Sequence, residues 1–136
     1  MEKGMMEWEW VDKLSPTTWA YVGDAVYELY MRLFTAQDGP RRSRDMHLAT
    51  AYYANAVFQA RAAKEIEPLL SVAEQDVLRR GRNVKTGHIP KTASPGEYRL
   101  STGLEALIGY LYLSGQEERV RELMLKIRQM KESDII

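Results

Sequence analysis

Two long segments with helical periodicity constrain the fold most, because they are the most apolar parts of the chain. The first runs from Thr17 to about Ala36 and follows Ser15 and Pro16, a hydroxyl cap and a proline typical of a helix start. The second runs from Leu100 to Leu113. The first is apolar on two sides, so we expect it to need cover on both, from the core or from another subunit.

The rest of the chain is also predicted to be helical. Helical spacing predicts a helix from Met46 to Lys64, and a capping box of Ser71 with Glu74 opens a short helix that ends near Arg80. An amphipathic helix is expected from Glu117 to about Lys131. No alternating strand of useful length is found. The expected fold class is therefore all-α, with residues 1–136 as a single domain.

Two segments are not expected to be regular. Residues 81–97 are rich in turn-forming residues without a sustained period, and long segments of this kind are often functional. The tail, residues 132–136, is expected to fray.

Composition excludes several classes of protein. Nineteen basic and nineteen acidic side chains cancel, so net charge gives no sign of a nucleic-acid partner. Without cysteine there is no disulfide framework, thiolate metal site or cysteine nucleophile. No stretch of about 18 apolar residues and no secretion signal is present. We therefore expect a soluble cytoplasmic protein without a membrane partner.

Each of the two apolar segments carries an acid that needs an explanation. Asp24 shares its side of the first helix with Ala20, Tyr27 and Met31, and Glu105 is the only acid from residue 99 to 115. An unpaired carboxylate taken out of water must protonate, find a cation or stay at the rim. If the two acids converge, Mg²⁺ or Mn²⁺ would satisfy both. The alternative is that each acid merely reaches the surface.

Neighbouring residues add to this pattern. Glu28 lies one turn after Asp24 and could assist a metal or form an ordinary ion pair with Arg32. Gly23 costs roughly 1 kcal/mol in a helix interior relative to alanine, which makes sense where another helix or a ligand approaches the backbone. Gly103 and Gly109 thin the second helix on either side of Glu105.

The residues YVGDAV (21–26) and LEALIGYLYL (104–113) together resemble the ribonuclease III catalytic domain, in which a G-D-A step precedes an E-A-L-I-G step. The linking RRGRNVKTGHIPK (79–91) is most similar to the short form called Mini-ribonuclease III, which lacks a double-stranded RNA-binding domain. The residues after Glu105 are too few for such a domain. The resemblance implies a helical endonuclease domain that acts as a homodimer and hydrolyses double-stranded RNA with Mg²⁺, or Mn²⁺ as a substitute.

The resemblance also implies roles for individual residues. Asp24 and Glu105 take the places of family acids, as catalytic residues and metal ligands. Other acidic positions of the family hold Thr17, Ala20 and Thr102 here, and residues 46–63 contain no acid. We therefore expect fewer acidic ligands on the metal, with water, Glu28 or Thr102 in the remaining coordination positions.

The implied reaction is metal-assisted hydrolysis that leaves a 5′-phosphate and a 3′-hydroxyl. The implied substrate is the stem of precursor large-subunit ribosomal RNA, and a ribosomal protein is a candidate helper. Neither His47 nor His88 lies near the acid motifs, so both are expected to be surface residues.

Residues 79–99 are strongly basic, although the net charge of the whole chain is zero. Six basic residues between positions 79 and 99 accompany a single acid, Glu97. They are Arg79, Arg80, Arg82, Lys85, Lys91 and Arg99. Such charges bind the phosphates of an RNA duplex with little sequence preference. The alternative is a solvated loop without a binding role, which would have the same composition. The resemblance favours RNA binding, because an enzyme without its RNA-binding domain must grip the duplex with something else.

Three functions compete at this point. The leading hypothesis is a Mg²⁺-dependent, double-strand-specific endoribonuclease. The alternative is a catalytically weak RNA- or ribosome-binding helical dimer, motivated by the missing acids. A purely structural helical dimer is the third.

Overall fold

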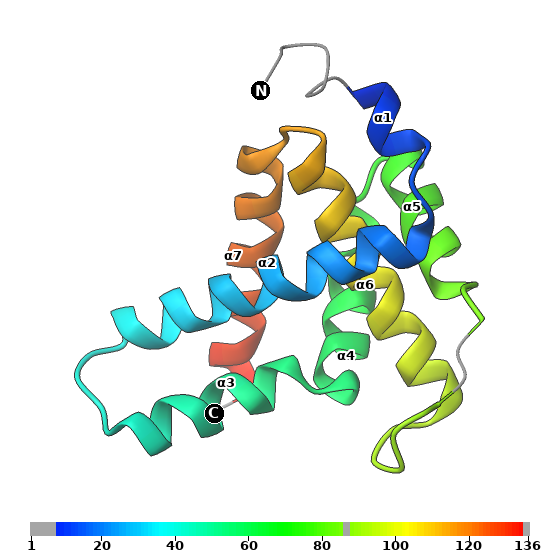
Figure 1. The fold of residues 1–136 in the computed structure, drawn as a ribbon. Helices are drawn as coiled ribbons and strands as arrows, with labels where there is room; N and C mark the ends of the chain where they lie inside the picture. The colour runs from blue at the N-terminus through cyan, green and yellow to red at the C-terminus, as the bar shows by residue number, and fades with distance from the viewer. Residues whose placement is uncertain (1–7, 86–87, 135–136) are drawn as a thin grey trace.

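The computed structural model describes residues 8–85 and 88–134 (Figure 1). The elements are α1 (Trp8–Asp12), α2 (Pro16–Gln37), α3 (Ser43–Ala54), α4 (Ala56–Ile66), the 3₁₀ turn η2 (Glu67–Leu69), α5 (Val72–Arg82), α6 (Pro95–Leu113) and α7 (Glu117–Asp134). Within these described ranges there is no strand, which confirms the all-α prediction. No helix in the described ranges is long and apolar enough to span a membrane.

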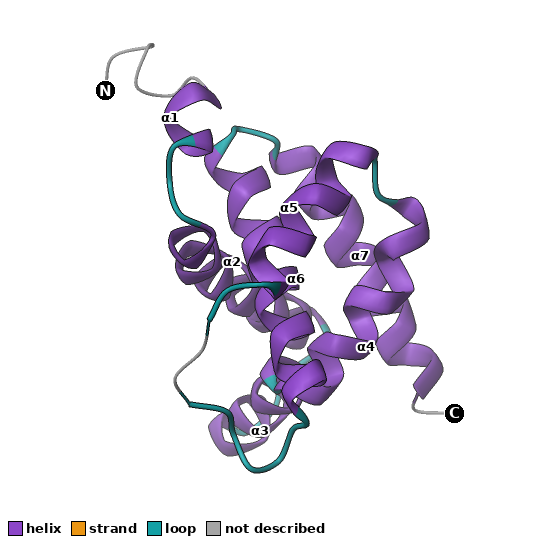
Figure 2. Cartoon of the chain, turned by 90° about the vertical axis from the view of Figure 1, so that its right-hand side faces the viewer, coloured by secondary structure: helices purple, strands orange, loops and turns teal. Residues whose placement is uncertain are grey.

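Helix α6 forms the centre of the molecule. It contacts α2, α4, α5 and α7, and Figure 2 shows it between α2 on one side and α4 and α7 on the other. Its side chains Leu104, Leu107 and Ile108 are fully buried, so the second apolar segment of the sequence is the heart of the core. Glu105 therefore sits on the helix at the centre of the fold.

Helix α2 crosses α6 and is covered on one side only. Ser15 caps its start by accepting a hydrogen bond from the Thr18 backbone N–H at 3.2 Å, as predicted. The side that carries Tyr27 and Met31 is buried, whereas Leu29 is 53% exposed. One apolar side of α2 thus packs in the core, and the other lies open on this chain.

The single helix predicted from Met46 to Lys64 is wrong, because the segment forms two helices that break at Asn55. Asn55 has an extended backbone, and its side chain accepts a hydrogen bond from the Phe58 backbone N–H at 2.8 Å. An asparagine side chain satisfies an orphan donor at a helix start and so favours a new helix over continuation. Apolar spacing continues across the break, which is why periodicity alone missed it.

The irregular segment is shorter than predicted. Helix α6 begins at Pro95 rather than Leu100, because Ser94 and Glu97 form a capping box that closes its first turn. Helix α5 extends to Arg82, so residues 83–94 connect the two helices, and residues 86–87 of the predicted loop lie outside the described residues.

Both ends of the chain also differ from the prediction. Helix α1 was not predicted, and it is held by Trp19, whose Nε1 donates to the Val11 carbonyl at 2.8 Å. The expected fraying is wrong for residues 132–134, because α7 continues to Asp134. Residues 135–136 lie outside the described part of the chain.

Candidate active site

Helices α2 and α6 cross at two glycines that lie against each other. A Cβ atom built on Gly23 would lie 1.6 Å from the Glu105 carbonyl oxygen, and one built on Gly109 would lie 1.8 Å from the Trp19 carbonyl oxygen. Any side chain at either position would force the two backbones apart. The close approach expected from Gly23 in the sequence is therefore confirmed.

This crossing brings Asp24 and Glu105 together. Asp24 is exposed on α2 and Glu105 is partly buried on α6, and the two carboxyl groups lie close enough for the charge of Asp24 to act on Glu105. Burial, followed by the negative charge of Asp24, raises the pKa of Glu105 to about 8. Without a cation Glu105 therefore retains its proton near neutral pH.

Tyr27 lies below the acid pair. Its hydroxyl donates to the Tyr53 carbonyl, and burial together with the negative charge of Glu105 raises the pKa of the phenol above its ordinary value. This tyrosine stays neutral and joins α2 to the end of α3.

The donor set of the pair fits a hard divalent cation. Carboxylate oxygens are the ligands that Mg²⁺ and Mn²⁺ prefer, and a cation would offset the negative charge of the two acids. In the described parts of the chain no group of three or more His, Asp or Glu side chains could hold a metal ion. The site thus offers two carboxylates, and water or RNA oxygens would complete the coordination.

Gln59 of α4 also belongs to this site, and the sequence analysis missed it. Its side chain is 2% exposed, and Nε2 donates to Glu105 Oε2 at 3.4 Å. Gln59 shares the helical spacing of the buried residues Ala62, Ala63 and Ile66. A polar residue on a buried stripe was the signal that could have found it.

The two other residues expected to assist a metal have partners of their own. Glu28 forms the ion pair with Arg32 that the sequence offered as an alternative, with 3.2 Å between Oε2 and Nη2. The hydroxyl of Thr102 donates to the Tyr98 carbonyl of its own helix at 3.1 Å. Each interaction would have to break before Glu28 or Thr102 could bind a metal beside the acid pair.

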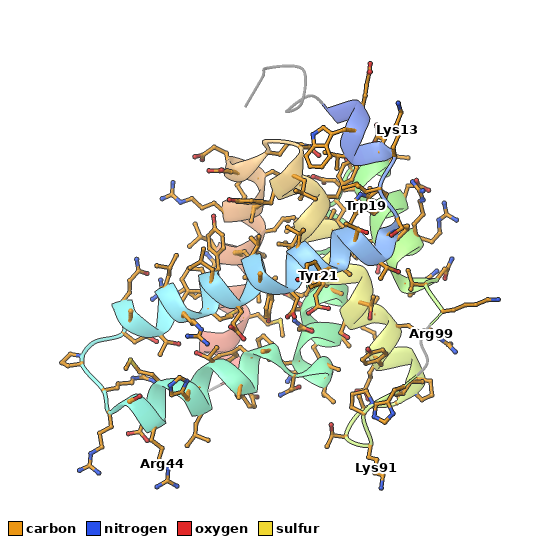
Figure 3. All side chains as sticks on the ribbon, viewed as in Figure 1. Lys13, Trp19, Tyr21, Arg44, Lys91 and Arg99 are labelled. Carbon is orange, nitrogen blue, oxygen red and sulfur yellow. The ribbon has the colours of Figure 1, made fainter. Side chains whose placement is uncertain are left out.

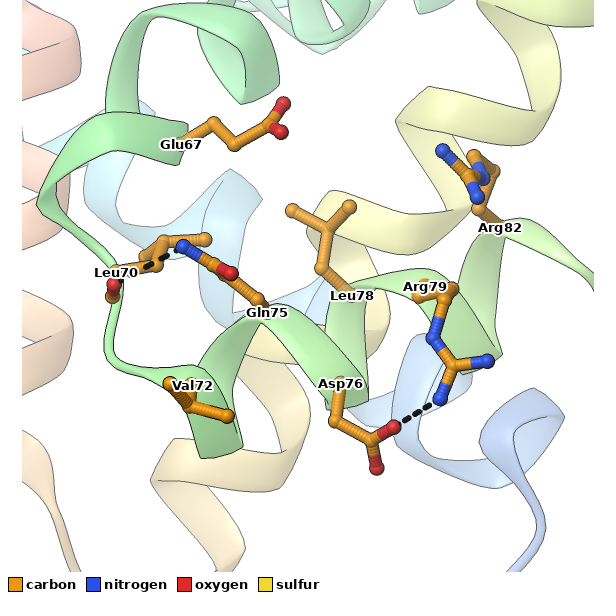
Figure 4. Close-up of a pocket in the computed structure, with 8 residues that line it drawn as sticks. All are labelled: Glu67, Leu70, Val72, Gln75, Asp76, Leu78, Arg79 and Arg82. Atoms are coloured by element: carbon orange, nitrogen blue, oxygen red, sulfur yellow. Dashed lines mark hydrogen bonds and ion pairs between the residues drawn. The ribbon is translucent and has the colours of Figure 1, made fainter.

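The basic residues of α5 differ in whether their guanidinium groups already contact another residue of the fold. Arg79 pairs with Asp76, and the guanidinium of Arg80 lies 4.9 Å from the ring centre of Trp19. Arg82 is exposed and lines a hollow between η2 and α5 together with Arg79, Glu67 and other residues (Figure 4). This hollow contains charges of both signs and neither Asp24 nor Glu105.

The remaining basic residues lie where the loop meets α6. Lys85, Lys91 and Arg99 are all exposed, and Lys85 and Arg99 line one shared hollow. Figure 3 shows Lys91 and Arg99 on the same side of the molecule. His47 and His88 are exposed, as the sequence predicted.

Comparison with known proteins connects this site to a family. Residues 17–116 match the family model described as the ribonuclease III domain, and this range includes both acids and the whole glycine crossing. The chain belongs to the ribonuclease III family. Its all-helical fold is accordingly that of a ribonuclease III domain.

Individual relatives within the ribonuclease III family are similar along most of their length. Mini-ribonuclease 3 of Symbiobacterium thermophilum is 48% identical over 111 residues, which cover 82% of this chain and 85% of that protein. Mini-ribonuclease 3 of a Thermoanaerobacter species is 41% identical over 133 residues, covering 91% and 94%. A solved protein structure from Fusobacterium nucleatum aligns with a TM-score of 0.80 and 28% identity, covering 88% of this chain and 95% of that one.

Proposed function

We propose that the chain is a divalent-metal-dependent endoribonuclease that cleaves double-stranded RNA. The observation that carries the proposal is the Asp24–Glu105 pair, two carboxylates from different helices that the close crossing of α2 and α6 brings together. Membership of the ribonuclease III family supports the nuclease class, and the similarity to Mini-ribonuclease 3 proteins supports RNA as the substrate. Mg²⁺ is the proposed cation, with Mn²⁺ as a substitute.

Asp24 and Glu105 would hold the cation, and each contributes differently. When bound, a divalent ion supplies a water of lowered pKa and neutralises charge that develops on the phosphate. The Asp24 side chain is exposed and so can be reached by an RNA backbone, whereas Glu105 anchors the site from the interior of the fold. Hydrolysis of this kind leaves a 5′-phosphate and a 3′-hydroxyl.

The proposed substrate is the stem of precursor large-subunit ribosomal RNA, with a ribosomal protein as a candidate helper. Both rest on the resemblance to the short form of the family. The proposals of a single domain over residues 1–136 and of a cytoplasmic location rest on the sequence composition instead. The exposed charges of Arg82, Lys85, Lys91 and Arg99 are the proposed contacts to duplex phosphates. Arg79 and Arg80 contribute less, because each already has a partner in the fold.

The protein is proposed to act as a homodimer through the open side of α2. Tyr21, Leu29 and Leu33 lie there and are 80%, 53% and 47% exposed. Large apolar side chains gathered on one helix favour a protein partner over water. A second copy of the chain is the partner that the family resemblance implies.

A catalytically weak RNA- or ribosome-binding dimer is the second candidate. It is favoured by the small number of acids, since in the described part of the chain no third carboxylate joins Asp24 and Glu105, where the family pattern has more. The purely structural dimer has no observation of its own to support it.

Cleavage of a long RNA duplex in Mg²⁺ tests the proposal. We expect Asp24→Asn and Glu105→Gln each to lower the cleavage rate by about 100-fold or more, the scale for losing one group that stabilises a transition state. Glu65→Gln, which changes an exposed acid on α4, is the matched control and should cleave normally. Cleavage that survives both site substitutions would refute the assignment.

A binding assay on the same duplex separates the candidates. Wild-type protein that binds duplex RNA but does not cut it in Mg²⁺ or Mn²⁺ supports the second candidate. Ligation of an adaptor to the products, which requires a 5′-phosphate, checks the proposed product ends.

A further inference from the structure

Gln59 differs from three of the four other buried polar residues in the described part of the chain. Thr35, Ser101 and Ser114 each donate a hydrogen bond to a carbonyl of their own helix. The Gln59 amide instead reaches from α4 to a carboxylate on α6, at 3.4 Å from Nε2 to Glu105 Oε2. Those three side chains bond within their own segment, whereas Gln59 connects two helices through an acid of the candidate site.

The position of Gln59 gives it no packing advantage over an apolar residue. It lies on the buried stripe of α4 with Ala62 and Ile66, where an apolar side chain of similar size would fill the space without desolvating an amide. A buried amide costs about 1–3 kcal/mol unless its hydrogen bonds are made. Such a residue is therefore best explained by what its amide does for Glu105.

The chemistry of the amide suits that task. A lysine or arginine at this position would neutralise Glu105 and compete with a cation, and another acid would repel it. An amide is neutral and donates an N–H to one carboxylate oxygen, which orients the group while leaving its negative charge available. The direction of the bond also leaves the second oxygen of Glu105 outside this interaction.

We propose that Gln59 is a positioning residue that orients the Glu105 carboxylate so that it and Asp24 present their oxygens jointly to a divalent cation. The inference rests on the proposed function and assigns a third residue to the same site. Gln59 does not touch the metal or the RNA, and it acts through Glu105.

Binding of Mn²⁺ to the RNA-free protein, followed by electron paramagnetic resonance, tests the inference without relying on activity. Gln59→Met keeps the approximate volume and removes the amide. We expect Mn²⁺ to bind this variant about 10–100-fold more weakly, the usual cost of losing a partner that orients a metal ligand. At saturating RNA, a higher Mg²⁺ requirement for cleavage should accompany the weaker binding.

Two further variants isolate the cause. Ser101→Ala removes a buried hydroxyl from α6 that bonds only its own helix in the structure, and it should bind Mn²⁺ as wild type does. In a Glu105→Gln background, Gln59→Met should cause no further loss of Mn²⁺ affinity, because its effect passes through Glu105. A purely structural role would instead add to the loss.

Each outcome bears on a specific claim. Wild-type Mn²⁺ affinity in Gln59→Met overturns the role of Gln59, while failure of wild-type protein to bind Mn²⁺ overturns the proposed function itself. If Gln59→Met does not fold, Gln59→Asn serves instead, because its shorter amide cannot span the distance to Glu105. Unchanged Mn²⁺ affinity in that variant likewise overturns the inference.

Discussion

Gly23 and Gly109 lie face to face where α2 crosses α6. A Cβ built on Gly23 would lie 2.8 Å from the Gly109 nitrogen, and one built on Gly109 would lie 2.8 Å from the Gly23 nitrogen. Each glycine therefore permits the other helix to approach at backbone distance. Because Asp24 follows Gly23 directly, the same crossing sets the separation of the two acids.

Alanine at either glycine should damage both the fold and the site. Overpacking in a core typically costs 1–3 kcal/mol, and a Cβ that meets backbone rather than a flexible side chain should reach about 3 kcal/mol or more. We expect Gly23→Ala and Gly109→Ala to lower the free energy of unfolding, measured by urea denaturation, and to reduce cleavage. Gly96→Ala is the matched control, since its Cβ would meet nothing closer than the Ser94 hydroxyl at 4.0 Å. Stable, fully active glycine variants would contradict the crossing described above.

The raised pKa of Glu105 predicts an unusual pH dependence of stability. Because the pKa of Glu105 is about 8 in the folded protein against 4.5 for the ordinary group, the folded state binds more protons between these values. Its contribution to the metal-free stability must therefore fall as pH rises from about 4.5 to 8. Glu105→Gln cannot titrate, so its melting temperature relative to wild type should rise over that window, by several degrees at pH 8.

Melting curves in EDTA at pH 5, 6.5 and 8 measure this difference, and the comparison cancels the titration of all other groups. Adding Mg²⁺ at pH 8 should raise the melting temperature of wild type but not of Glu105→Gln. A difference between the two proteins that does not change with pH would mean that Glu105 titrates as an ordinary carboxylic acid.

The two acids and their glycines were predictable from the sequence for a physical reason. Asp24 and Glu105 are the acids whose helical neighbours are apolar, and Gly23 is an expensive residue inside a helix unless a backbone approaches it. Both signals are local, because they depend only on residues within a turn or two. The helical class and the central role of α6 follow from the same kind of local pattern.

Features that depend on tertiary contact could not be read in this way. Gln59 and Glu105 are 46 positions apart, and only the packing of α4 on α6 turns an ordinary glutamine into part of the site. The break at Asn55 was missed because apolar spacing continues through it. The start of α6 was a different failure, since the Ser94–Glu97 capping box was visible in the sequence but lay inside a segment dominated by turn formers.

The exposed charges from the end of α5 to the first turns of α6 should control the salt dependence of RNA binding. We expect replacement of Arg82, Lys85, Lys91 and Arg99 by glutamine to weaken binding and to flatten the slope of log affinity against log salt. Each phosphate that the protein no longer neutralises removes about 0.9 from that slope on a DNA duplex, and a similar scale applies to RNA. Arg80 is left intact because its contact with Trp19 helps to hold α2 and α5 together.

Filter binding from 50 to about 300 mM salt measures the slope. The double variant Arg42→Gln, Arg44→Gln removes exposed charges near the start of α3 and is the control, with a slope close to that of wild type. An unchanged slope in the fourfold variant would place the grip on the duplex elsewhere on the molecule.

The open side of α2 predicts the effect of charge on assembly. Leu29→Glu combined with Leu33→Glu places two charges where apolar side chains are half-exposed on the single chain, so it should not unfold the protein. If a second copy covers this side, association would bury the two new charges without partners, which is costly. Sedimentation velocity should therefore show monomers where wild type forms dimers. Val72→Glu, on a side chain 84% exposed at the start of α5, should leave the dimer intact. A wild-type protein that sediments as a monomer at micromolar concentration, or a double variant that still dimerises, would show that α2 does not form the interface.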